Sequence, residues 1–151
     1  MLAHRIGSKR FCGTALDAFS GRGSLHGHGR WHHRGRLAVY VASHESLALL
    51  EILVHLNRKT DLQPMVHWTV EIPDEVIEDE PKLAPDWAGN PEYTRQLGDS
   101  WLASGRAPAL RVPSAIVRSE HNLLLNPAHP DFDLQWVRSG PVPIKIDDRL
   151  L

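Results

Sequence analysis

The most regular run of apolar positions in the chain begins at residue 37. Residues 37–42 (LAVYVA) are nearly all apolar and β-rich, which predicts a strand buried on both faces. Ser43 is suited to cap a helix, and Glu45 would place a negative charge in its first turn, so we expect a helix over about residues 44–57. Apolar side chains point in almost every direction around this helix, which predicts a central position in the fold.

One narrow stripe of this helix is polar and consists of Glu51, His55 and Arg58. Two interpretations fit the stripe. In the first, Glu51 pairs with His55 one turn later and both face water. In the second, Glu51 faces a binding site, because a helix that is otherwise buried offers few other places for a carboxylate. The helical pattern alone leaves both open.

The remaining periodic segments are mostly short and typical of strands. Residues 66–72 alternate apolar and polar, as a half-buried strand does. Residues 109–117 are strand-like, but Pro113 indicates an edge or a bend at a site. Residues 91–104 predict a second helix with Gly98 weakening its middle. Shorter elements are a helical turn or bend at 16–19, an edge strand at 4–6, an apolar stretch at 122–127, and strands at 134–137 and 142–146.

These elements make about six strands, one strong helix and one weaker helix, which is an α+β chain with a compact mixed β-sheet core. With 151 residues, the chain is expected to form a single domain over residues 1–151. A formal charge of −1 gives no reason to expect a polyanion as the main partner. Cys12 is the single cysteine and no apolar run is long enough to span a membrane, so we expect a cytoplasmic protein. The acidic segment 75–85 is expected to be a solvated surface.

A glycine-rich loop, residues 20–29, precedes the first buried strand. Glycines let main-chain amides approach a ligand closely, although a mobile loop without a role has the same composition. Four histidines lie in or beside this loop: His26, His28, His32 and His33. No cysteine and no suitably spaced carboxylate accompanies them, so we expect exposed loop residues and no metal site.

Four polar residues lie beside apolar segments and could meet around a ligand: Arg30, Tyr40, Glu51 and Ser114. Arginine binds phosphate with two parallel hydrogen bonds, and tyrosine offers a flat face to a base or pyridine ring. A glutamate can hold a ribose hydroxyl and stabilise positive charge at a sugar carbon. The usual glycine-rich phosphate motifs are absent from the sequence, so these residues by themselves indicate only a possible nucleotide site.

Longer strings of the sequence resemble the RES-domain toxins of bacterial Xre–RES type toxin–antitoxin systems. The resemblance covers nearly the whole chain, with its motifs in the family's order. The matching segments are residues 29–31 (GRW), 39–43 (VYVAS), 47–56 (LALLEILVHL), 98–102 (GDSWL), 110–115 (LRVPSA), 122–132 (NLLLNPAHPDF) and 148–150 (DRL).

This resemblance implies a fold similar to that of ADP-ribosyltransferase toxins and an activity that degrades NAD by cleaving its nicotinamide–ribose bond. Arg30 would bind phosphate, Tyr40 would stack on or orient the nicotinamide end, and Glu51 would engage the ribose. Ser114 would hydrogen-bond the substrate or fix a catalytic side chain, and Arg5 would be a second phosphate contact. NAD would be a substrate rather than a cofactor, with inorganic phosphate as a possible co-substrate.

The resemblance also implies a partner, an Xre-type antitoxin with a helix-turn-helix domain that blocks the active site. The toxin would then touch DNA only through the antitoxin and would not bind a membrane. Two loop positions depart from the family's usual Gly-Gly-Arg-Trp-Asn, which here has His28 and His32 in place of the first glycine and the asparagine. Three hypotheses follow: an NAD glycohydrolase or phosphorylase, an ADP-ribosyltransferase that modifies a protein, and a non-catalytic binding module.

Overall fold

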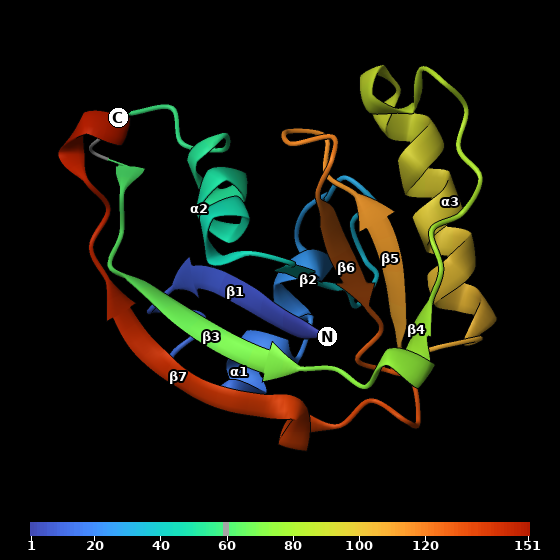
Figure 1. Ribbon diagram of the computed structural model, residues 1–151, viewed down its shortest axis with the longest axis horizontal. Coiled ribbons are helices and arrows are strands. Elements are labelled where there is room, and N and C mark those ends of the chain that lie inside the picture. The colour runs from blue at the N-terminus through green and yellow to red at the C-terminus, as the bar shows by residue number, and fades with distance from the viewer. Residues whose placement is uncertain (59–60) are drawn as a thin grey trace.

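A mixed seven-stranded sheet forms the centre of the computed structural model, which describes residues 1–58 and 61–151. The strand order is β4-β5-β6-β2-β1-β3-β7, and all neighbours are antiparallel except β4 and β5 (Figure 1). The α+β class predicted from the sequence is therefore confirmed. The strands are β1 (Leu2–Ser8), β2 (Val39–Ala42), β3 (Met65–Glu71), β4 (Ile77–Glu78), β5 (Ala109–Pro113), β6 (His121–Leu125) and β7 (Val137–Ile144).

Helices cover both faces of this sheet (Figure 1). On one face, α2 (Glu45–Leu53) packs with β1 and β2, and α3 (Pro91–Ser104) packs with β5 and β6. On the other face, α1 (Ala15–Phe19) packs its Phe19 edge-on against Trp68 of β3. Within the described part of the chain, none of the helices combines the length and apolar content needed to cross a membrane.

Helix α2 is shorter and more exposed than its apolar pattern predicts. It ends at Leu53, and its N-cap is His44, which makes no side-chain capping bond, rather than Ser43. Leu47 and Ala48 are its buried residues, whereas Leu50 is 36% exposed. The expected central position is therefore wrong, because α2 buries one side against the sheet and leaves the other side open.

Three other expectations change for identifiable reasons. Strand β1 is not an edge strand but lies between β2 and β3, and its polar residues concealed this interior position. The last two predicted strands become one, since residues 134–136 form a 3-10 turn that leads into β7. The acidic segment contributes β4, where the Glu78 carboxylate accepts a 2.6 Å hydrogen bond from the indole of Trp101.

Helix α3 matches its predicted span and begins with an Asn90 cap. Gly98 lies in its middle, where glycine weakens a helix by about 1 kcal/mol relative to alanine. A Cβ atom at this position would lie 1.7 Å from the carbonyl oxygen of Trp31. Trp31 itself is only 1% exposed. Gly98 therefore permits the close contact between α3 and the loop that contains Trp31.

Gly98→Ala tests this contact. The gain in helix propensity of about 1 kcal/mol is opposed by a backbone clash, and overpacking of this kind costs about 1–3 kcal/mol or more. We expect a net loss of stability and a fall in the melting temperature of about 2–4 °C for each kcal/mol lost, measured by circular dichroism. Ser100→Ala, at an exposed position of the same helix, is the control and should leave it unchanged. An equally stable Gly98→Ala protein would contradict the close contact.

Candidate active site

The Glu51 carboxylate on α2 is held by two side chains that come from β6 and from the end of β5. Its Oε1 atom accepts a hydrogen bond of 3.1 Å from Ser114 Oγ and one of 2.7 Å from Asn122 Nδ2. Both donors bind the same oxygen, so in the described part of the chain Oε2 has no protein donor. The structure thus favours the interpretation in which Glu51 faces a site over the one in which it pairs with His55 in water.

Ser114 is fully buried at the point where β5 ends at Pro113, as the predicted bend required. Its hydroxyl oxygen accepts hydrogen bonds from the backbone amides of Ile116 and Val117, both at 3.1 Å. The single hydroxyl proton is therefore directed to Glu51. This arrangement makes Ser114 a group that orients the Glu51 carboxylate.

Asn122 is the site residue that sequence reasoning missed. It lies near the start of β6, and its buried Oδ1 atom has no hydrogen-bond partner among the described residues. A buried carbonyl oxygen without a donor is costly, which makes it a candidate ligand contact. Two features of the sequence could have indicated Asn122. It is a polar residue that opens the apolar run 122–125, and it lies on the same side of the strand as Leu124.

Tyr40, on β2, pins the loop that contains Arg30. Its hydroxyl accepts a 3.1 Å hydrogen bond from the Trp31 amide and lies 2.7 Å from Nδ1 of His32. Burial raises the pKa of Tyr40 well above its usual value, so the hydroxyl stays protonated. A Cβ atom on Gly29 would lie 2.5 Å from this hydroxyl, so a side chain at position 29 would have to displace Tyr40.

His32 is buried, which corrects the prediction that the loop histidines are exposed. Burial lowers its pKa and favours the neutral imidazole, which carries one N–H. Its Nε2 atom lies 3.0 Å from the Gly27 carbonyl oxygen, which can only accept, so Nε2 carries the proton. Nδ1 then accepts the hydrogen bond from Tyr40. The histidine that replaces the family's usual asparagine therefore still fixes the loop.

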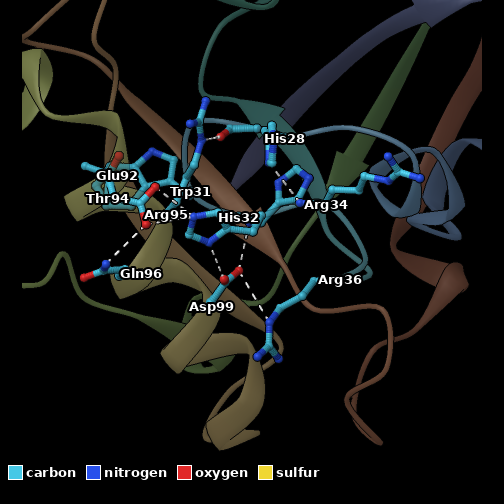
Figure 2. A network of polar contacts seen from close by, with 12 residues as sticks. His28, Trp31, His32, Arg34, Arg36, Glu92, Thr94, Arg95, Gln96 and Asp99 are labelled. Atoms are coloured by element: carbon cyan, nitrogen blue, oxygen red, sulfur yellow. Dashed lines mark hydrogen bonds and ion pairs between the residues drawn. The ribbon is translucent and has the colours of Figure 1, made fainter.

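Helix α3 holds the backbone on both sides of Arg30 through Thr94 and Arg95, which are labelled in Figure 2. The Arg30 carbonyl accepts a 2.7 Å hydrogen bond from Thr94 Oγ1, and the Gly29 carbonyl accepts one of 2.9 Å from Arg95 Nε. The Arg30 guanidinium donates through Nη1 to the Ala88 carbonyl at 2.9 Å. Among the described residues, the guanidinium is thus directed by one carbonyl oxygen and pairs with no carboxylate, which leaves its charge available for an anion.

His33 joins the same loop to α3 through two carboxylates. Its Nδ1 atom lies 2.6 Å from Asp99, which also accepts from the His33 amide, and its Nε2 atom lies 2.9 Å from Glu92. These hydrogen bonds, the one to Glu92 foremost, raise the pKa of His33 above its usual value. Asp99 belongs to the GDSWL segment, so this segment serves to clamp the loop. His33 is also not the exposed residue that we expected.

The Arg30 loop and the Glu51 cluster share one face of the sheet. Tyr40 lies opposite Leu124 and Ala42 lies opposite Asn122 in the β2–β6 register, so Tyr40 and Asn122 are diagonal neighbours. Such neighbours are about 7–8 Å apart and point to the same side. This is the face that bears α2 and α3, with the β5–β6 connection rising between them (Figure 1). A cation and a carboxylate therefore border the same part of the sheet.

Arg5 makes a different set of contacts. Its Nη1 atom donates to the Tyr40 carbonyl at 3.1 Å, and its Nη2 atom lies 3.9 Å from Cys12 Sγ. In the β1–β3 register it lies opposite Trp68, whose side chain belongs to the core on the α1 side of the sheet. These contacts tie β1 to β2, and a role for Arg5 in phosphate binding stays a prediction.

The His33 clamp predicts a pH-dependent stability. Because the folded-state pKa of His33 is raised, its contribution is fully present below the unfolded pKa of about 6.5 and is lost as pH rises through the folded value. The gap in melting temperature between wild type and His33→Gln should therefore be larger at pH 6 than at pH 9. His26→Gln, at an exposed loop position, should show no such gap. A gap that is the same at both pH values would contradict a charged clamp.

Comparison with known proteins places these features in a family. Residues 2–147 match the RES domain. A protein named Toxin Res from Yersinia enterocolitica is 36% identical over 157 residues, with 99% of each chain covered. A second protein named Toxin Res, from Pseudomonas putida, is 45% identical, and the aligned segment covers 78% of this chain and 83% of that protein. A Sphingobium protein named Prs ADP-ribosylating toxin is 41% identical, with 76% of each chain covered.

A solved structure shares the fold. The crystal structure of the Mycobacterium tuberculosis MbcT-MbcA toxin–antitoxin complex contains a chain that matches with a TM-score of 0.75, covering 95% of this chain and 83% of that one. At 17% identity this match concerns the fold. The family match and the relatives that align over nearly their whole length agree with the motif order in the sequence. The chain therefore belongs to the RES-domain family of toxins.

Proposed function

We propose that this toxin consumes NAD by cleaving the bond between nicotinamide and ribose. One observation carries the proposal: Ser114 and Asn122 hold the Glu51 carboxylate through Oε1 and leave Oε2 for a ligand. The orientation of this carboxylate is thus set before a substrate arrives. Such preorganisation is the main means by which protein groups stabilise charge that develops in a transition state.

Glu51 acts at the ribose in this proposal. Its Oε2 atom accepts a hydrogen bond from a ribose hydroxyl, and its negative charge stabilises the oxocarbenium-like centre that forms at the anomeric carbon. The carbon–nitrogen bond breaks and its electron pair leaves with nicotinamide, which becomes neutral. Water or phosphate then adds to the anomeric carbon, and the attacking group loses its proton. Neither step needs a redox partner.

Arg30 supplies the positive charge for the diphosphate. Its Nη1 atom is fixed to the Ala88 carbonyl, and the loop backbone around it is bound to Thr94 and Arg95 of α3. The remaining guanidinium N–H groups can bind phosphate oxygens. The Tyr40 hydroxyl is committed to the loop, so Tyr40 contributes to binding by holding this loop and by the face of its ring, which orients the nicotinamide end.

Transfer of ADP-ribose to a protein is the second candidate function. The observation that favours it is the relative named Prs ADP-ribosylating toxin, which is 41% identical to this chain. The first step, departure of nicotinamide, is the same, and only the group that adds to the ribose differs. The non-catalytic module is less well supported, because His32 keeps the loop fixed despite the departure from the family motif.

We also propose that a cognate antitoxin of the Xre type controls the activity by covering the site. The related fold in the MbcT-MbcA toxin–antitoxin complex supports such a partner. DNA contact would then come from the antitoxin, which agrees with the formal charge of −1 on this chain.

Glu51→Gln tests the proposed function. Purified protein without antitoxin is incubated with NAD, with and without phosphate, and the products are identified by mass spectrometry. We expect release of nicotinamide, together with ADP-ribose if water attacks or a phosphorylated ADP-ribose if phosphate attacks. Glu51→Gln should lower the rate by at least about 100-fold while the circular dichroism spectrum is kept.

The control is His55→Ala. His55 is exposed and belongs to the same polar stripe of the sequence as Glu51, and this variant should keep full activity. Adding a cell extract separates the two candidates, because transfer to a protein would give ADP-ribose adducts of defined mass. If folded wild-type protein leaves NAD intact and binds no nicotinamide nucleotide in calorimetry, the enzymatic proposal fails.

Ser114→Ala separates the two roles considered for this residue. If Ser114 only orients Glu51, loss of its hydrogen bond should lower kcat by about 10–100-fold and leave KM for NAD nearly unchanged. A contact with the substrate in the ground state would raise KM instead. Ser119→Ala, at an exposed serine of the same β5–β6 connection, is the matched control and should match wild type.

A further inference from the structure

A group of possible metal ligands lies away from the glycine-rich loop. It consists of His4 on β1, His67 on β3 and Glu45 in the first turn of α2. One ligand atom from each residue lies within 4.8 Å of the other two. None of the contacts described for Glu51, Arg30 or Tyr40 involves these residues, so this group is separate from the candidate active site.

The two imidazoles face each other closely. Nδ1 of His4 lies 3.0 Å from Nε2 of His67, and the rings are nearly parallel, with an angle of 20° between their planes and 5.2 Å between their centroids. Glu45 Oε1 lies 3.7 Å from Nδ1 of His67. A pair of imidazoles with a carboxylate is one of the donor sets found in zinc sites with three protein ligands.

We propose that His4, His67 and Glu45 bind a divalent transition-metal ion of the zinc class. The fourth position of a tetrahedral ion would be open to water or another small ligand. The proposal concerns a second site on this protein and is independent of the reaction proposed at Glu51.

The dimensions of the group fit such an ion after small movements. Tetrahedral zinc binds nitrogen and carboxylate oxygen at about 2.0–2.2 Å, so its ligand atoms lie about 3.4 Å apart. The two imidazole nitrogens need to separate by a few tenths of an ångström, and Glu45 must rotate inward. The Glu45 side chain is 55% exposed, and it must leave Nδ1 of His67 to reach an ion that is held at Nε2 of the same ring.

The donor set of two imidazoles and one carboxylate suits a cation. The N-terminus of α2 disfavours a nearby cation, but the Glu45 carboxylate in its first turn opposes this effect. Imidazole ligands also select zinc over magnesium, which prefers oxygen.

A bound ion would tie α2 to the paired strands β1 and β3. Helix α2 buries only Leu47 and Ala48 fully against the sheet. Coordination through Glu45 would tie the first turn of α2 to β1 and β3. Because α2 also carries Glu51, the ion would stabilise the helix that bears the candidate catalytic carboxylate.

Zinc titration of the untagged protein tests the site by calorimetry and by thermal denaturation. We expect one ion per chain with low-micromolar or tighter affinity, and a rise in melting temperature of about 5 °C at saturating zinc. His67→Asn should abolish binding. Glu45→Gln should weaken it at least about tenfold, and because this side chain is exposed the variant should fold normally. Magnesium should give no saturable binding.

The matched control is the double variant His26→Asn/His28→Asn, which removes two exposed loop histidines and should bind zinc as the wild type does. The proposal is overturned if the wild type shows no saturable binding. It is equally overturned if the loop variant loses the site while Glu45→Gln and a folded His67→Asn protein retain it.

Discussion

The close contact between the Trp31 carbonyl and Gly98 is the constraint on which the candidate site depends. It brings the loop that contains Arg30 against α3 at a distance that no side chain at position 98 would allow. Thr94 lies one turn before Gly98 and Asp99 follows it directly, and both can then reach the loop backbone. The hydrogen bonds between this loop and α3 therefore depend on the close approach that Gly98 permits.

The two charged groups of the site, Arg30 and Glu51, are both oriented by hydrogen bonds to uncharged groups. Arg30 donates to a carbonyl oxygen, which directs the guanidinium without cancelling its charge. Glu51 accepts from a hydroxyl and an amide, which direct the carboxylate without adding a countercharge. Neutral partners therefore hold both groups, and the full charge of each stays available to a ligand. An ion pair at either position would have neutralised the charge of that side chain.

The sequence predicted the parts of the fold that local patterns determine. Helix α3 and strand β3 follow from periodicity, and Ser114 follows from the bend at Pro113. Strand β1 was misplaced because its interior position depends on pairing with β3, some sixty residues later. Asn122 was missed because a single amide at a strand end has no periodic signal, and its meaning appears only beside Glu51. His32 and His33 were assigned to solvent because composition does not reveal that α3 folds back over their loop.

The hydrogen bonds to Glu51 also bear on the order of events during folding. They join residues 63 and 71 positions apart in the chain. Contacts of such long sequence separation carry a high loop-closure cost and form late relative to local helices. Helix α2 can exist without them, but its carboxylate has no fixed direction until β5 and β6 have joined the sheet. The fixed direction of this carboxylate therefore appears only with completion of the tertiary structure, and a partly synthesised chain that already contains Glu51 lacks it.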